Sequence, residues 1–169
     1  MAGGISDTDR KNAQKIVAQK IRDFGFEIYS ASENDSINDK SNDPTPIDIY
    51  NGDIDRVKES DIFIVRISGG NEDGTLSEIG MVAGWNEQIA KINHLKYNYN
   101  QLCDIENQQR GSNPIKIIAY TTNERLFNPD FSQGIPSAGF NHLVLGMIQK
   151  WGLFVGNEDD MLDYVRDLI

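Results

Sequence analysis

The sequence predicts an α/β fold in which helices flank a mostly parallel sheet. Short apolar runs rich in β-branched residues alternate along the chain with segments whose apolar residues recur at helical spacing. Strands that alternate with helices in this way form parallel sheets. The length of 169 residues, without an internal repeat, fits one domain over residues 1–169.

In the first part of the chain, two helices are predicted around a strand and a long loop. Residues 6–24 follow the cap-forming run Ser-Asp-Thr, place an apolar stripe at helical spacing and stop before Gly25. FEIYSA (26–31) is predicted as a short strand, and the Ser-, Asn- and Asp-rich residues 32–46 as a loop. Residues 47–60 again show helical spacing. The stripe of the first helix comprises Ile16, Val17, Ile21 and Phe24.

The remaining elements continue the alternation. DIFIVRI (61–67) is an apolar, β-branched run typical of a buried central strand, and a glycine-rich turn joins it to a helix over 75–85. NPIKIIAYTT predicts a further buried strand, followed by a helix, the short strand LFV and a closing helix. The closing helix begins near Asn157 or Glu158. Together with a very short first strand before Gly3, these runs predict a flavodoxin- or Rossmann-like parallel sheet of five strands.

Two segments depart from this regular pattern. Residues 90–112 are polar and lie between a helix and a strand; such an insertion is either a flap over a pocket or plain surface. Only Met1 and Ala2 precede the first glycine turn. Either the first strand is very short, or residues upstream are missing from this chain.

Charge and composition exclude several classes of function. The formal net charge of −10 repels phosphate backbones, so binding to DNA or RNA is not expected. No apolar run approaches the roughly 20 residues of a membrane span, and the N-terminus lacks the apolar region of a signal peptide. A single cysteine, Cys103, fits a reducing cytoplasm, and one cysteine with two histidines cannot provide the usual zinc ligands.

The loops after the strands are where a ligand is expected, because open α/β sheets bind ligands beyond the carboxyl ends of their strands. The stretch NEDGTLSEIGMVAGW (71–85) brings acids and glycines to the start of a helix. Within it, Thr75 and Glu78 have the spacing of a helix capping box, so Glu78 is either a cap or a reactive carboxylate. A helix N-terminus would lower the pKa of such a carboxylate.

Catalysis, where present, must rest on acidic residues. The sequence contains no Gly-x-Ser-x-Gly elbow, no Walker A motif and no Gly-x-Gly-x-x-Gly. An ionised carboxylate aimed into a pocket suits attack on a glycosidic carbon. Each acid also has a plain structural interpretation: Asp53 fits a solvated helix face, while Glu72 and Asp73 fit a turn.

Four stretches together resemble the nucleoside 2-deoxyribosyltransferase family. They are AGGISDTDR, IYNGDIDRVKESDIFIV, DGTLSEIGMVAG and, more weakly, GFNHLVLG. The resemblance covers Ala2 to about Met147, apart from the insertion. It implies an enzyme without a cofactor or metal that exchanges nucleobases on 2-deoxyribonucleosides, with retention, through a covalent sugar ester on a glutamate.

The resemblance also implies roles for individual acids. Glu78 stands at the position of the nucleophile, and Asp53 at that of the acid that protonates the departing base. An aspartate six residues before the nucleophile often holds the sugar in this family. That position is Glu72 here, with Asp73 beside it, so either acid could serve, and we favour Asp73.

The substrate-binding residues implied by the resemblance lie in the same motifs. Gly3 and Gly4 would lie against the base or sugar. Tyr50, which by pattern alone fits the core, is matched to substrate binding, as are Gly74 and Thr75.

An asparagine of a neighbouring subunit completes the site in this family. Asn141 matches it, although by itself it would fit the surface or a helix cap. The resemblance therefore implies a homo-oligomer, a dimer or an assembly of dimers. Two alternatives remain open: a nucleoside or nucleotide N-glycoside hydrolase of the same superfamily, and a non-catalytic nucleoside-binding module.

Overall fold

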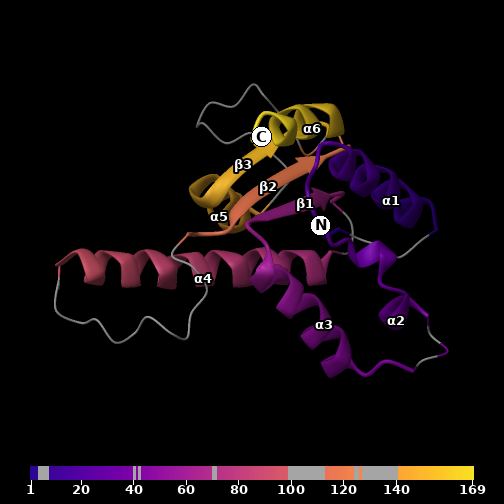
Figure 1. Cartoon of the computed structure of the whole chain (residues 1–169), viewed down its shortest axis with the longest axis horizontal. Helices are drawn as coiled ribbons and strands as arrows, with labels where there is room; N and C mark the ends of the chain where they lie inside the picture. The colour runs from indigo at the N-terminus through magenta and orange to yellow at the C-terminus, as the bar shows by residue number, and fades with distance from the viewer. Residues whose placement is uncertain are drawn as a thin grey trace.

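A parallel sheet lies at the centre of the computed structural model, which describes residues 1–3, 8–39, 41, 43–69, 72–98, 113–123, 126 and 141–169. Within these residues the sheet has three strands in the order β1-β2-β3, with Ile64 of β1 opposite Ile118 of β2. The elements, shown in Figure 1, are α1 (Thr8–Asp23), η1 (Ala31–Glu33), α2 (Asp35–Asn38), α3 (Pro46–Glu59), β1 (Ile62–Ile67), α4 (Asp73–Asn98), β2 (Lys116–Thr121), α5 (His142–Trp151), β3 (Gly152–Val155) and α6 (Glu158–Arg166). The α/β class with a parallel sheet is confirmed.

The expected five strands are not confirmed. FEIYSA forms no assigned strand, and residues 1–3 pair with β1 through a single parallel bridge between Ala2 and Val65. The backbone N–H of Ala2 donates to Ile64 (2.9 Å) and that of Arg66 donates to Ala2 (3.0 Å). A β-ladder needs several consecutive pairs of backbone hydrogen bonds. Residue 1 forms backbone hydrogen bonds with residues 29 and 31, and this stretch of pairing is too short to make a strand.

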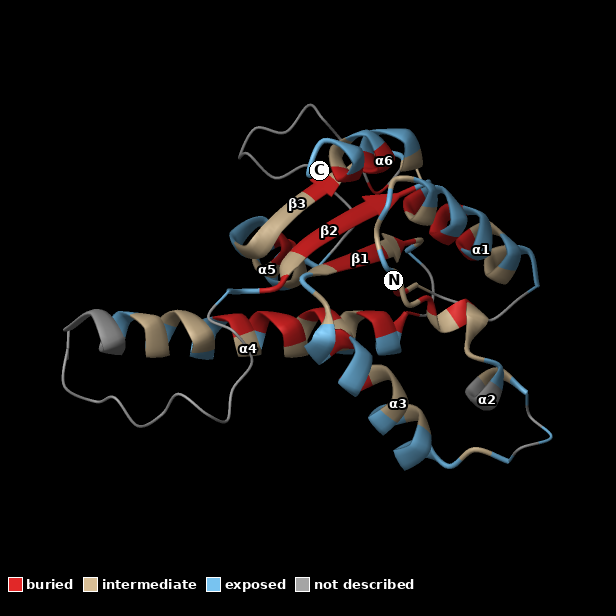
Figure 2. Ribbon diagram, in the orientation of Figure 1, coloured by how far each residue is buried: buried red, intermediate tan, exposed pale blue. Residues whose placement is uncertain are grey.

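Helices cover both faces of the sheet because residues alternate between faces along each strand. On one face, β1 and β2 residues pack against α4 and α5; Figure 2 shows buried residues along the strands and along the N-terminal half of α4. On the other face, Ile64 and Ile118 pack against α1 and α6. Ile16, expected in the stripe of the first helix, is 58% exposed, because Val17 and Ile21 define the buried face.

Helix α4 is longer than expected. It runs to Asn98, so the first residues of the expected insertion continue the helix, while 99–112 lie outside the described residues. Asn86 anchors its middle: its fully buried amide donates to the carbonyl of Ile115 and accepts from the N–H of Ile115, both at 2.8 Å. This pair of bonds ties α4 to the residue that precedes β2.

Side-chain caps set the beginnings of α3 and α6. Thr45 and Asp48 form a capping box at the start of α3. Asn157 accepts from the N–H of Asp160 at the start of α6, as the sequence predicts. The loop expected over residues 32–46 includes the short helices η1 and α2.

No helix in the described part of the chain is long and apolar enough to cross a membrane.

Substitution of Gly152 tests how closely the backbone of β3 approaches that of β2. A methyl group at this position would lie 1.6 Å from the carbonyl oxygen of Ile117, the residue paired with Gly152. We expect Gly152→Ala to lower the free energy of unfolding by about 3 kcal/mol or more, because backbone atoms must move. Urea unfolding followed by circular dichroism measures it.

Gly146 in the preceding helix provides the matched control. It is exposed, and a methyl group there meets nothing within 4 Å. Gly146→Ala should stabilise the protein by about 0.5–1 kcal/mol through helix propensity. Equal effects of the two substitutions would contradict the close approach at Gly152.

Candidate active site

Two partly buried carboxylates lie close enough to interact electrostatically, one on each of the helices that precede and follow β1. Asp53 lies on α3 and Glu78 in the second turn of α4, and β1 connects the two helices. Both side chains are partly buried, and the charge of Asp53 acts on Glu78. The structure thus brings together the two acids that the sequence motifs single out.

Burial dominates the electrostatics of Glu78. Withdrawal from water raises the pKa of Glu78 from 4.5 to about 7, and the nearby charge of Asp53 contributes a smaller part of this rise. The amino group of Met1 acts in the opposite direction and lowers the pKa. The expectation that the helix N-terminus keeps this pKa low is therefore wrong. Near neutral pH, Glu78 is poised between its acid and its carboxylate.

Asp53 carries a hydrogen-bond partner that the motifs do not indicate. The hydroxyl group of Tyr29 donates to Oδ1 of Asp53 (3.2 Å), and the amide of Asn34 donates to that hydroxyl (2.9 Å). Burial raises the pKa of Asp53, while the bond from Tyr29 and the amino group of Met1 lower it. Tyr29 lies in FEIYSA, where the strand pattern gives no indication of a contact with α3.

Glu72 is committed to the turn between β1 and α4. Its buried carboxylate accepts from the N–H and hydroxyl groups of Ser68, both at 2.6 Å, and from the N–H of Gly69 at 3.2 Å. Asp73, the first residue of α4, is exposed. Of these two acids, only Asp73 presents its side chain to solvent.

The capping-box interpretation of Thr75 and Glu78 is wrong. Because α4 begins at Asp73, Thr75 is already inside the first turn, where it is buried, and Glu78 lies one turn further along. Glu78 is consequently too far from the start of the helix to cap it. Gly74, which directly precedes Thr75, is exposed, and a methyl group there would meet nothing within 4 Å.

The first glycine turn packs tightly against two polar side chains. Gly3 has a φ of +153°, and a methyl group there would meet Nε2 of Gln14 at 2.8 Å and Cβ of Arg66 at 3.2 Å. Gln14 is 1% exposed, and among the described residues both its amide atoms lack a hydrogen-bond partner. Gly4 lies outside the described residues.

Tyr50 and Asn141 are exposed. Tyr50 is 51% exposed on α3, one turn before Asp53, so the core interpretation is wrong and a substrate contact stays a prediction. Asn141 caps α5, accepting from the N–H of Leu143 at 2.9 Å. It lies on another element than the two carboxylates, and its contribution to a neighbouring subunit stays a prediction.

The surface hollows found around α3 do not define this site. Two of them lie between residues 26–29 and the end of α3, lined by Tyr29 and Arg56 among others, and neither includes Asp53 or Glu78. The candidate site therefore rests on the two carboxylates and not on either hollow. Across the described ranges, no three His, Cys, Asp or Glu side chains converge as metal ligands would.

Comparisons with known proteins identify a family and a fold. The model of a protein family described as nucleoside 2-deoxyribosyltransferase matches residues 1–147 of this chain. A crystal structure of a conserved protein from Enterococcus faecalis V583 is similar in fold, with a TM-score of 0.68 and 21% identity over 99% of this chain and 96% of that chain. No curated protein matches the sequence.

The different tasks of Glu72 and Asp73 predict different effects on stability. Glu72→Gln places an amide NH2 group among backbone donors, so we expect the free energy of unfolding to fall by about 1–3 kcal/mol. Asp73→Asn should cost only about 0.3–1 kcal/mol, through the helix dipole. Urea unfolding at pH 7.5 measures both values, and equal losses would contradict the role given to Glu72.

The raised pKa of Glu78 predicts how stability depends on pH. The folded state holds the Glu78 proton up to about pH 7 and the unfolded state only up to 4.5, so this contribution is present below 4.5 and lost as pH rises through 7. At about 1.4 kcal/mol per pKa unit, the loss is at most about 3 kcal/mol.

Glu78→Gln removes this titration. The variant should be more stable than the native protein by up to about 3 kcal/mol at pH 8, and nearly equal to it at pH 5. Glu27→Gln changes an exposed carboxylate and should shift stability by less than about 0.5 kcal/mol at both values. Urea unfolding at each pH measures the difference, and a constant offset would show that Glu78 is not the titrating group.

Proposed function

We propose, from the premise that this chain belongs to the nucleoside 2-deoxyribosyltransferase family, that it exchanges nucleobases on 2-deoxyribonucleosides. The observation that carries the proposal is the electrostatically coupled pair of carboxylates, Asp53 and Glu78, withdrawn from water on neighbouring helices. Two such acids with separated tasks are what retaining glycosyl transfer requires.

The reaction proceeds in two steps, formation and then breakdown of a sugar ester on Glu78. The carboxylate of Glu78 attacks C1′ of the sugar and forms an ester; the bond from C1′ to the base breaks, its electron pair goes to the base, and the base takes a proton from Asp53. An acceptor base then attacks C1′, releases Glu78 as a carboxylate and returns a proton to Asp53. Two inversions at C1′ give retention.

The surrounding residues bind the substrate. Asp73 holds the sugar hydroxyl groups, because its carboxylate is exposed at the start of α4, whereas Glu72 is engaged in the turn. Gly3 and Gly4 allow the substrate to approach the backbone of the first turn, and Gly74 and Thr75 form the floor beside Glu78.

Tyr50 and Asn141 extend the site outward. Tyr50 projects from α3 one turn before Asp53 and lies against the base. Asn141 completes the site of a neighbouring subunit in a homo-oligomer; the 69% exposure of Leu143, two residues later, favours a protein contact at the start of α5. The enzyme acts in the cytoplasm on free nucleosides and bases, without cofactor or metal.

Incubation with thymidine and adenine tests the activity. We expect deoxyadenosine and thymine, separated by chromatography. Glu78→Gln should lower the rate at least about a thousandfold, and Asp53→Asn about 10²–10⁴-fold. Free base and sugar without an acceptor would instead identify a hydrolase. Binding without turnover, unaffected by Glu78→Ala, would identify a nucleoside-binding module.

A mechanism-based probe tests the nucleophile directly. A 2-fluoro-2-deoxyarabinosyl nucleoside should leave a covalent sugar adduct on the peptide that contains Glu78, detected by mass spectrometry, because the fluorine slows the second step. Glu78→Gln is the control and should give no adduct. An adduct on another residue, with Glu78→Gln still active, would overturn the assignment.

A further inference from the structure

The side chain of Tyr29 lies between the acid Asp53 and the amide of Asn34. We propose that Tyr29 is a positioning residue, whose hydroxyl group orients the Asp53 carboxyl group for proton transfer to the departing base. The inference rests on the proposed function and adds a residue to it from outside the sequence motifs.

The direction of the hydrogen bonds carries the argument. The Asn34 amide nitrogen has only hydrogens to offer, so it donates to the Tyr29 oxygen at 2.9 Å. The single hydroxyl hydrogen of Tyr29 is thereby directed to Oδ1 of Asp53, 3.2 Å away. Oδ1 is occupied as an acceptor, and Oδ2 is left to carry the transferable proton.

Helix α3 also holds the ring of Tyr29. The guanidinium group of Arg56, three residues after Asp53, lies 5.7 Å from the ring centroid, within the range of a cation–π contact. One helix therefore contacts Tyr29 at its ring through Arg56 and at its hydroxyl group through Asp53. Rotation of Tyr29 away from Asp53 would break both contacts.

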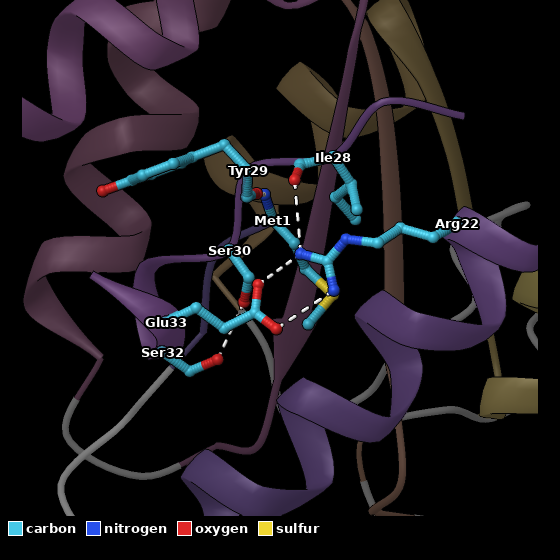
Figure 3. A network of polar contacts seen from close by, with 7 residues as sticks. All are labelled: Met1, Arg22, Ile28, Tyr29, Ser30, Ser32 and Glu33. Atoms are coloured by element: carbon cyan, nitrogen blue, oxygen red, sulfur yellow. Dashed lines mark hydrogen bonds and ion pairs between the residues drawn. The ribbon is translucent and has the colours of Figure 1, made fainter. Parts of the chain in front are cut away.

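A separate polar network fixes the segment that carries Tyr29. Figure 3 shows both oxygens of Glu33 paired with Arg22 of α1, which also donates to the carbonyl of Ile28 at 3.5 Å. The hydroxyl groups of Ser30 and Ser32, both buried, are 2.8 Å apart. The Tyr29 ring points away from this network in Figure 3, so the network holds its backbone and leaves its hydroxyl group for Asp53.

Proton transfer makes this bond stronger during the reaction. As the bond from C1′ to the base breaks, the base takes the proton from Oδ2 and Asp53 becomes a carboxylate. A hydrogen bond to a charged acceptor is stronger than one to a neutral acid, so Tyr29 stabilises the transition state more than the ground state.

The charged groups around Asp53 set the sign of the pH effect. Glu78 faces it from α4, the amino group of Met1 from the first residues, and Arg56 acts on Tyr29 from α3. Burial raises the pKa of Asp53 and the bond from Tyr29 lowers it. Removal of the hydroxyl group should therefore raise the pKa of Asp53 further.

Tyr29→Phe tests the proposal through kinetics. We expect kcat with thymidine to fall about 10–100-fold with KM changed less than about threefold. The loss should be smaller with 5-fluoro-2′-deoxyuridine, whose base leaves more easily as an anion, and the alkaline limb of the rate profile should move to higher pH. Asn34→Leu, which leaves Tyr29 unchanged, should lower kcat in the same way but by a smaller factor.

Two further measurements make the test decisive. Tyr164→Phe removes a hydroxyl group on α6 and should leave the rates within about twofold. Carbon-13 NMR titration of the Asp53 carboxyl group, assigned with Asp53→Asn, should show a higher pKa in Tyr29→Phe than in the native protein. This titration does not require turnover, so it separates failure of the inference from failure of the proposed function.

The inference is overturned by an unchanged Asp53 titration in Tyr29→Phe. It is also overturned if the native enzyme is active but Tyr29→Phe loses equal activity with both nucleosides at an unchanged pH profile, because that result describes a purely structural residue.

Discussion

The position of Glu78 depends on the turn from β1 into α4, and the carboxylate of Glu72 fixes that turn. Its three hydrogen bonds to Ser68 and Gly69 compensate for burial to 5% exposure. The amide of Asn123 donates to the carbonyl of Ser68 at 3.2 Å and ties the same turn to the end of β2. A charge buried at this point sets where α4 begins, and so on which turn of the helix Glu78 lies.

The apolar stripes of α3 and α4 then explain why both acids are withdrawn from water. Val57, one turn after Asp53, and Ile79, next to Glu78, belong to the same core cluster, which packs on one face of the sheet. Two helices that bury their stripes against one sheet face bring the residues at the edges of those stripes together. The carboxylates therefore lie at the border of the core, where the surrounding apolar atoms limit their hydration.

The sequence predicts the parts of this arrangement that local periodicity encodes. The helices α3 and α6 and the β-branched run of β1 are each visible within a window of a few residues, and the structure confirms them, although Tyr50 on α3 is exposed. Contacts between distant segments carry no such signal. Tyr29 reaches α3 across 24 residues, and Asn86 bonds Ile115 across 29. The capping-box interpretation of Glu78 failed for the same reason, because Glu72 and its bonds to the preceding loop, rather than Thr75, decide where α4 starts.

The pKa of Glu78 shows which of two opposed effects dominates. A helix N-terminus stabilises a carboxylate by about 0.3–1 kcal/mol, and the effect fades beyond the first turn, which Glu78 has already passed. Burial and the charge of Asp53 act in the other direction, and a rise from 4.5 to about 7 corresponds to about 3 kcal/mol. Desolvation therefore dominates.

Near neutral pH, two coupled acids of this kind favour holding one proton between them rather than carrying two charges. In the proposed reaction Glu78 must be ionised while Asp53 is protonated. In the proposed reaction, positive charge develops on the sugar as its bond to the base breaks, and the carboxylate of Glu78 stabilises that charge.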